Sequence, residues 1–214
     1  MIADSAGSCT GVILAGGAAS RYGGRPKGLE RVGGRRIIDR VADALTAATE
    51  SLLLIANDDR AGEWLAGVRW QRDVRPGLGG LGGIHAALVH AGTPVIVVAW
   101  DMPFVPAELL LELRAAAADA DVAVPESGSR RGVEPLCAYY GLACREAIER
   151  RLAADDRRVV GFYEDVRVAR LSPAAIARHG EPATIFMNVN TPEDLELAEE
   201  HATAAHGRRD RPEA

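Results

Sequence analysis

The chain has 214 residues, of which 48% are hydrophobic, so it can bury a full core as one domain. Its net charge of −5 is spread over interspersed acidic and basic residues, which argues against binding to nucleic acid or to a membrane surface. No apolar run approaches the ~20 residues of a transmembrane helix, and the first residues lack the basic character of a signal peptide. The cysteines Cys9, Cys137 and Cys144 form no CxxC pair, which predicts reduced thiols and a cytoplasmic location.

Short apolar runs alternate with helix-like segments through the first 125 residues. The runs predict strands at 11–15, 52–56, 68–71, 94–100 and 122–125. Segments with helical periodicity lie between them, at 37–48, 84–91 and 107–118. The run at 95–98 is continuously apolar, and a strand that is buried on both faces is typical of a parallel sheet covered by helices. The pattern therefore predicts an α/β fold with a mostly parallel central sheet.

The remainder of the chain is less regular. It predicts a strand at 133–140, a helix at 142–153, a strand at 185–189 and a final helix at 192–205. Thr191 suits the N-cap of that last helix, and Pro192 suits its first position. We expect a single domain over residues 1–206 and a disordered tail at 207–214.

A glycine-rich loop, LAGGAASRYGGRPKG at 14–28, follows the first predicted strand. It holds five glycines together with Arg21 and Lys27. Glycines let backbone N–H groups approach a phosphate closely, and the two cations attract its oxygens. The spacing fits neither a P-loop nor a dinucleotide-binding fingerprint, and the loop continues through Gly33 and Gly34 in the manner of a lid. A polyphosphate site is one interpretation, and an ordinary turn with solvated basic residues is the other.

Asp101 directly follows the most apolar predicted strand, so it is expected at the carboxyl edge of the sheet, beside the glycine-rich loop. One carboxylate suffices to hold Mg²⁺ with a nucleotide, because phosphates and water fill the other positions. The alternative, an N-cap of the next helix, is disfavoured because Pro103 and Pro106 delay the helix start.

Two further groups are weaker signals. Five glycines between 77 and 83 suit a backbone surface for a base or ribose, or a flexible loop without a ligand. The pairs Arg130-Arg131 and Arg157-Arg158 suit a second anionic substrate, although such pairs are more often solvated.

These pieces, in this order, resemble the MobA-type nucleotidyltransferases, the molybdenum cofactor guanylyltransferases. The resemblance is carried by LAGGAASRYGGRPKG at 14–28, the segment 73–84 that ends GGLGGI, WDMPFVP at 100–106 and NVNTPEDL at 188–195. It implies a Rossmann-like three-layer sandwich whose nucleotide-binding half spans about 9–125 and whose substrate half spans about 126–206. It also implies transfer of GMP from GTP to molybdopterin with release of pyrophosphate. Molybdenum-insertion and molybdoenzyme-chaperone proteins are the implied candidate partners.

The resemblance assigns roles to individual residues. Nucleotide binding falls to Leu14, Ala15, Gly16, Gly17, Lys27, Asn57, Asp73 and Asp101. The catalytic set is Arg21, Lys27 and Asp101, with Asp101 as the Mg²⁺ ligand. The candidates for the molybdopterin side are Arg130, Arg131, Arg157, Arg158, Asn188 and Asn190. The chain departs from the family pattern at Tyr22, at Pro26 and at Gly80, where methionine, aspartate and proline are usual.

No nucleophile–base pair stands out in the sequence, and this chemistry does not need one. A phosphate monoester is already ionised near pH 7, since its second pKa is about 6. Positioning and electrostatics are then expected to supply most of the catalysis. The motif Leu14-Ala15-Gly16-Gly17 favours GTP over CTP, because the related cytidylyltransferases tend to read Leu-Ala-Ala-Gly at these positions. Transfer of CMP, transfer to a sugar phosphate, and an inactive nucleotide-binding regulator are the alternatives.

Overall fold

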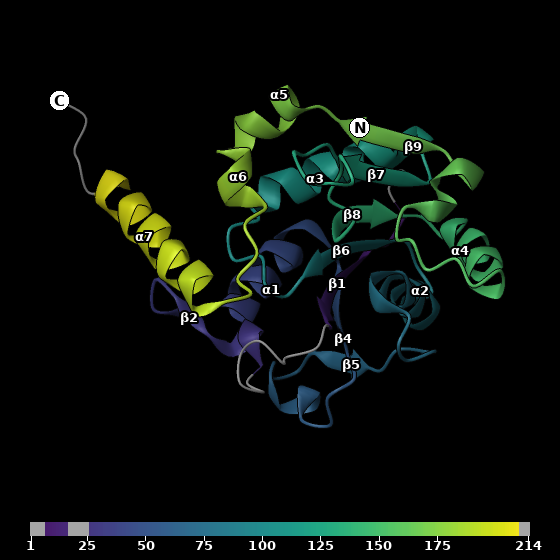
Figure 1. Cartoon of the computed structure of the whole chain (residues 1–214), viewed down its shortest axis with the longest axis horizontal. Coiled ribbons are helices and arrows are strands. Elements are labelled where there is room, and N and C mark those ends of the chain that lie inside the picture. Colours follow the sequence, from purple (N-terminus) through teal and green to yellow (C-terminus); the bar gives the residue numbers. More distant parts are fainter. Residues whose placement is uncertain (1–6, 17–25, 210–214) are drawn as a thin grey trace.

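The chain forms one seven-stranded sheet with helices on both faces, seen in a computed structural model that describes residues 7–16 and 26–209 (Figure 1). The strand order is β5-β4-β1-β6-β8-β7-β9, and of these seven described strands only β8 runs antiparallel to its neighbours. The strands are β1 (Thr10–Ala15), β4 (Ser51–Ala56), β5 (Arg69–Gln71), β6 (Val95–Ala99), β7 (Val122–Pro125), β8 (Cys137–Tyr140) and β9 (Val168–Leu171). The predicted α/β fold with a mostly parallel sheet is confirmed.

Helices cover the sheet in two layers, which completes the three-layer sandwich. The main helices of these layers are α1 (Ile37–Ala48), α2 (Gly79–Ala91), α3 (Ala107–Ala116) and α4 (Cys144–Ala153), and a further long helix, α7 (Pro192–Arg209), ends the described chain. Along β1, Ile13 packs into the core beneath α1 and α3, whereas Val12 and Leu14 pack beneath α2 and α4. The central strands are therefore buried on both faces, as their continuous apolar runs require.

The segment between β1 and α1 contains more regular structure than the predicted lid. Lys27 opens a short 3-10 turn, η2 (Lys27–Leu29), and a hairpin follows, formed by β2 (Arg31–Val32) and β3 (Arg35–Arg36). Gly33 and Gly34 both have positive φ and form its turn. Residues 17–25 lie outside the described part of the chain, so the rest of the lid prediction stays untested.

The strand prediction at 185–189 is wrong. Ile185 ends the short helix α6 (Pro182–Ile185), which opens on a proline at its first helical position. Two other short helices precede it, α5 (Pro173–Ile176) and η6 (Ala177–His179). The residues from 186 to 190 carry no strand and lead directly to α7.

Among the boundaries that differ from the predictions, three differ by several residues. The strand at 133–140 shortens to β8, because Pro135 has no N–H to donate, and Val133 makes only an isolated bridge to Glu126. The helix predicted from Ile84 begins earlier, at Gly79. The last helix continues to Arg209 rather than ending at Ala205, and residues 210–214 of the predicted tail lie outside the described residues.

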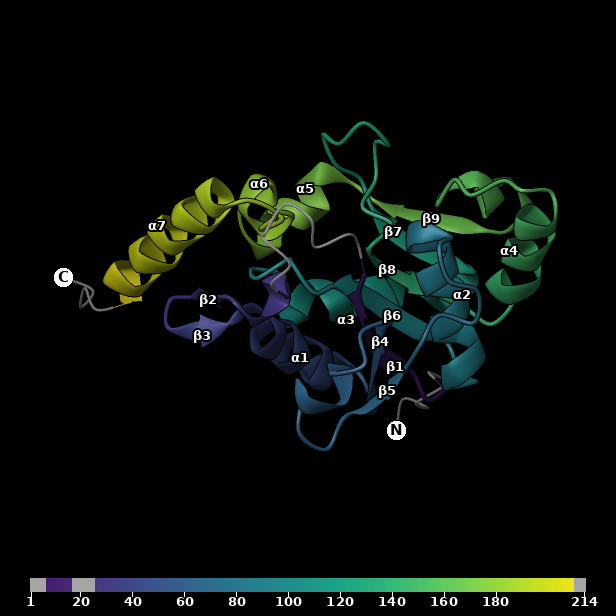
Figure 2. The same cartoon turned by 60° about the horizontal axis from the view of Figure 1, so that its bottom comes forward.

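The helix α7 extends away from the sheet beside the β2–β3 hairpin (Figure 2). The N–H of Gly33 donates to the Glu199 carboxylate over 2.9 Å, which ties the hairpin to the helix. As predicted, the Thr191 hydroxyl caps the helix by accepting from the Asp194 N–H at 3.2 Å. Among the described residues, 7–16 and 26–209, no helix is both long enough and apolar enough to cross a membrane.

Candidate active site

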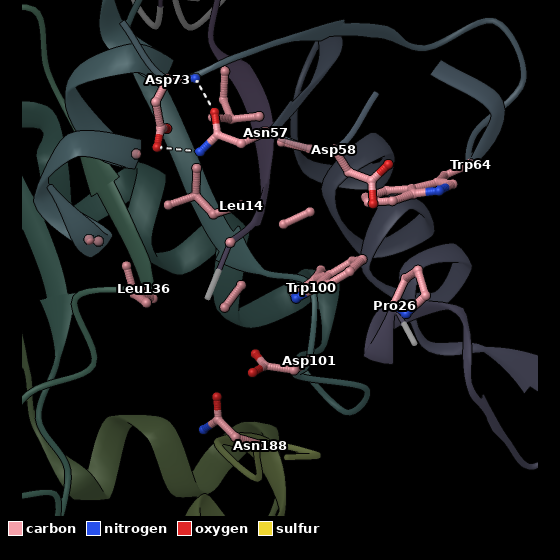
Figure 3. Close-up of a pocket in the computed structure, with 18 of the residues that line it drawn as sticks. Leu14, Pro26, Asn57, Asp58, Trp64, Asp73, Trp100, Asp101, Leu136 and Asn188 are labelled. Carbon is pink, nitrogen blue, oxygen red and sulfur yellow. Dashed lines mark hydrogen bonds between the residues drawn. The ribbon is translucent and has the colours of Figure 1, made fainter. Parts of the chain in front are cut away.

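A cleft of about 570 Å³ lies at the carboxyl ends of β1, β4 and β6 (Figure 3). This is the edge at which parallel α/β sheets bind ligands. Its lining includes the predicted residues Leu14, Ala15, Gly16, Asn57, Asp73, Asp101 and Asn188. It also includes Pro26, Asp58, Trp64, Trp100 and Leu136, which the sequence analysis did not assign to a site. The structure thus brings residues from most of the chain's length to one place.

Three side chains from distant segments meet at the edge of this cleft. The Lys27 ammonium donates to Asp101 Oδ2 at 2.5 Å and to Asn190 Oδ1 at 2.7 Å. Both charged side chains are largely buried, with 17% of Lys27 and 10% of Asp101 exposed. Burial strengthens the attraction between the charges, and it makes loss of either partner costly. Asn190 therefore contacts the predicted phosphate-binding lysine rather than standing apart from it.

The other oxygen of Asp101, Oδ1, is buried and has no hydrogen-bond partner among the residues that the structure describes. A buried carboxylate oxygen without a donor is unfavourable, so this atom suits a cation or a donor from a ligand. The described residues hold no group of three or more His, Cys, Asp or Glu side chains placed for a metal. A single carboxylate oxygen is compatible with a cation that takes one or two carboxylates and completes its shell with phosphates and water.

The NVNTPEDL segment fixes the backbone around Asp101. The Val189 N–H donates to the Asp101 carbonyl oxygen at 2.9 Å. One carboxylate oxygen of Asp194 accepts from the backbone N–H groups of Asn190 and Thr191, each at 2.9 Å. The segment thereby places the Asn190 amide against Lys27, which gives this motif a positioning function.

Asn57 and Asp73 form a second polar pair across the cleft (Figure 3). The Asn57 amide donates to Asp73 Oδ2 at 2.8 Å, and the Asp73 N–H donates back to Asn57 Oδ1 at 3.0 Å. Asn57 follows β4 and Asp73 follows β5, so two neighbouring strand ends are joined. The reciprocal bonds hold both side chains in place for a ligand.

The second glycine cluster forms the start of α2 and one wall of the cleft. Gly79, with φ of +61°, opens the helix. A Cβ on Gly83 would lie 3.3 Å from Leu14 Cδ1, and one on Gly80 would lie 3.2 Å from Val159 Cγ2. Gly83 therefore lets the helix approach the end of β1 closely, and Gly80 lets it approach Val159, so both glycines serve packing as well as any ligand.

The MobA-like NTP transferase domain pattern matches residues 11–169, which is most of the chain. The chain belongs to the MobA-like NTP transferase family. A molybdenum cofactor guanylyltransferase from Desulfosudis oleivorans is 36% identical over 194 residues, covering 89% of this chain and 94% of that relative. A probable molybdenum cofactor guanylyltransferase from Pelotomaculum thermopropionicum is 40% identical over 187 residues, covering 87% of this chain and 89% of the relative.

A solved structure supports the same family. Molybdopterin-guanine dinucleotide biosynthesis protein A from Archaeoglobus fulgidus superposes with a TM-score of 0.76 at 28% identity. The match covers 91% of this chain and 99% of that one.

The two arginine pairs of this MobA-like transferase that were predicted for the molybdopterin side do not line the cleft. Arg130 and Arg131 lie on an exposed turn between β7 and β8. Arg157 and Arg158 pair with Asp155 and Asp156 respectively, two residues back in the same turn. Hydrogen bonds from Arg158 lower the pKa of Asp156 to about 2. The candidates Gly17 and Arg21, and the unusual Tyr22, lie outside the described residues.

Proposed function

We propose that the chain is a molybdenum cofactor guanylyltransferase, which transfers GMP from GTP to the phosphate of molybdopterin and releases pyrophosphate. Relatives of that name, 36–40% identical over most of the chain, support this reaction. The observation that carries the proposal is Asp101, whose unpartnered buried oxygen lies beside Lys27 at the ligand-binding edge of the sheet.

The nucleotide would occupy the cleft between β1, α2 and the Asn57–Asp73 pair. Leu14, Ala15 and Gly16 would contact the guanine nucleotide, and the Asn57–Asp73 pair offers fixed amide and carboxylate groups for its base or ribose. Lys27 would bind the phosphates, together with Gly17 and Arg21 of the same loop. The Gly16-Gly17 pair favours GTP over CTP.

We propose Mg²⁺ as the metal, with Asp101 as its protein ligand and the nucleotide phosphates completing its coordination. When bound, Mg²⁺ supplies positive charge near the reacting phosphate and the departing pyrophosphate. Lys27 adds a second charge at the same place. Because Asn190 and the NVNTPEDL segment hold its ammonium, Lys27 is preorganised rather than free to rotate.

The acceptor would enter beside Asn188, which lines the cleft on the far side of Asp101 from Trp100 (Figure 3). Its phosphate needs no general base, since a monoester with a second pKa of about 6 is already ionised near pH 7. Asn190 borders the same region, and Arg130, Arg131, Arg157 and Arg158 remain candidates for anionic groups of molybdopterin that extend beyond the cleft. A cytoplasmic location and transfer of the product through molybdenum-insertion or molybdoenzyme-chaperone proteins belong to the same proposal.

Pyrophosphate release tests the proposal. The protein is incubated with Mg²⁺, molybdopterin and GTP, CTP, ATP or UTP in turn. We expect release with GTP that requires both molybdopterin and Mg²⁺. Release with CTP alone would assign cytidylyl transfer, and binding of GTP without turnover in the presence of molybdopterin would assign a regulator.

A further inference from the structure

Trp100 carries a polar group that the fold leaves without a partner. Its side chain lines the cleft, yet the residue is only 5% exposed, and its indole Nε1 has no hydrogen-bond partner among the described residues. An indole nitrogen can only donate, so this N–H requires an acceptor. Buried donors without one are uncommon in native proteins and point to a missing water, ion or ligand.

The ring is fixed from three directions. Trp64 stacks on it with the ring centroids 5.1 Å apart and the planes inclined by 23°. On another side the indole lies so close to Gly28 that any Cβ there would collide with the ring. The Trp100 backbone N–H donates to the Leu14 carbonyl at 3.1 Å, which locks its backbone to the end of β1. A ring held in this way is preorganised, because it cannot turn its N–H elsewhere without disrupting its packing.

The surroundings of the N–H select the type of acceptor. The nitrogen end of the buried indole lies on the side of the Asp101 carboxylate (Figure 3). The same side of the cleft holds the Lys27 ammonium and the unpartnered Asp101 Oδ1. An anionic oxygen suits these three groups best. It can accept from the buried N–H, pair with the ammonium and share a divalent cation with the carboxylate.

We propose that the Trp100 indole N–H donates a hydrogen bond to a non-bridging phosphate oxygen of the bound nucleotide. This inference rests on the proposed function, because it places the phosphates of that nucleotide between Lys27 and Asp101. Trp100 then determines where the phosphate chain lies, and Trp64 and Gly28 act through it as positioning residues. The tryptophan before the aspartate in WDMPFVP thereby gains a role in binding beyond packing.

Trp100→Phe removes the N–H and keeps an aromatic ring for the stack with Trp64. Dissociation constants are measured for GTP with Mg²⁺ and for guanosine, which lacks phosphate. Trp70→Phe is the matched control, since Trp70 lies on β5 beneath the Arg72 guanidinium, outside the lining of the cleft. We expect Trp100→Phe to weaken GTP binding at least tenfold and to change guanosine binding less than twofold, with neither changed in Trp70→Phe.

Equal affinity of Trp100→Phe and wild type for GTP would overturn the role of Trp100 alone. Equal losses for GTP and guanosine would also overturn it, because they would assign Trp100 to the base, the ribose or the shape of the cleft. A wild-type protein that binds no guanine nucleotide would overturn both this inference and the proposed function.

A second measurement does not depend on the folding of that variant. The chain has three tryptophans, so its indole N–H resonances can be assigned with Trp64→Phe and Trp70→Phe. We expect GTP with Mg²⁺ to move the Trp100 indole proton downfield and to slow its exchange with solvent, and guanosine to do neither. An indole resonance that is unchanged at saturating GTP would overturn the proposal.

Discussion

The substitution Asp101→Asn separates the charge of this residue from its shape. The asparagine has nearly the same volume, and its amide oxygen can still accept from the Lys27 ammonium, which also keeps Asn190 as a partner at 2.7 Å. The ion pair becomes a hydrogen bond between a charged and a neutral group. A hydrogen bond to a charged group contributes about 1.5–3 kcal/mol, and the ammonium keeps an acceptor at this position. We therefore expect the free energy of unfolding to fall by no more than the value of one such bond, ~3 kcal/mol.

That loss leaves a folded enzyme. At this chain length about 1 kcal/mol corresponds to roughly 2–4 °C in melting temperature, so the melting temperature should fall by no more than about 12 °C. Activity should fall much further, because the only carboxylate proposed for Mg²⁺ is gone. We expect kcat/KM to drop at least a hundredfold, equivalent to about 2.7 kcal/mol of transition-state stabilisation.

The assay is Mg²⁺-dependent pyrophosphate release with GTP and molybdopterin, run beside thermal unfolding. Asp43→Asn is the control for loss of one negative charge, because Asp43 pairs with Arg35 on the exposed side of α1, away from the cleft. Unchanged Mg²⁺-dependent release in Asp101→Asn would refute the metal role of Asp101. A variant that is inactive only because it has unfolded would be revealed by its thermal transition.

Three other changes test separate parts of the account. Lys27→Ala should lower kcat/KM more than tenfold, about 1.4 kcal/mol, and a smaller loss in pyrophosphate release would reduce Lys27 to a surface charge. Gly28→Ala should lower the free energy of unfolding in urea by about 1–3 kcal/mol, because the new methyl group would collide with Trp100. Gly16→Ala has open space at Cβ and should not lower it, so equal stabilities of the two variants would contradict the packing. Burial raises the pKa of the Cys9 thiol from 9.0 to about 11, so the unfolded chain loses this proton first and stability should fall as pH rises from about 9 to 11. Cys9→Ala should flatten that fall in urea midpoints, and an identical pH profile would contradict it.

The sequence was most informative where one local signal determines the structure. The continuous apolar run of β6 is buried on both faces of the sheet, and this alone places Asp101, which follows the strand after Trp100, at the carboxyl edge. Lys27 was identified from its glycine-rich loop in the same way. Neither prediction, for Asp101 or for Lys27, required knowledge of a contact between distant segments.

The errors arose where distant contacts override the local pattern. Residues 185–189 contain enough apolar side chains for a strand, but Ile185 and Val189 reach the core from a short helix and from the chain that follows it. Gly80 lowers helix propensity, yet α2 continues through it, where the helix packs closely against Val159 and Leu136.

The same limit applies to the site. Asn190 lies 163 residues from Lys27, and no spacing rule could place its amide oxygen against the ammonium. The orientation of the Trp100 indole depends on Trp64 and Gly28, which belong to two other segments. A sequence motif names the residue, and only the packing shows which of its atoms faces the cleft.

The most direct test of the central claim is the mass of the reaction product. The protein is incubated with molybdopterin, Mg²⁺ and an equimolar mixture of the four nucleoside triphosphates, and the pterin products are identified by mass spectrometry. The account predicts one new product, molybdopterin joined to GMP, and its absence from the reaction of Asp101→Asn. A product that carries CMP, or unmodified molybdopterin after complete incubation with the wild-type protein, would contradict it.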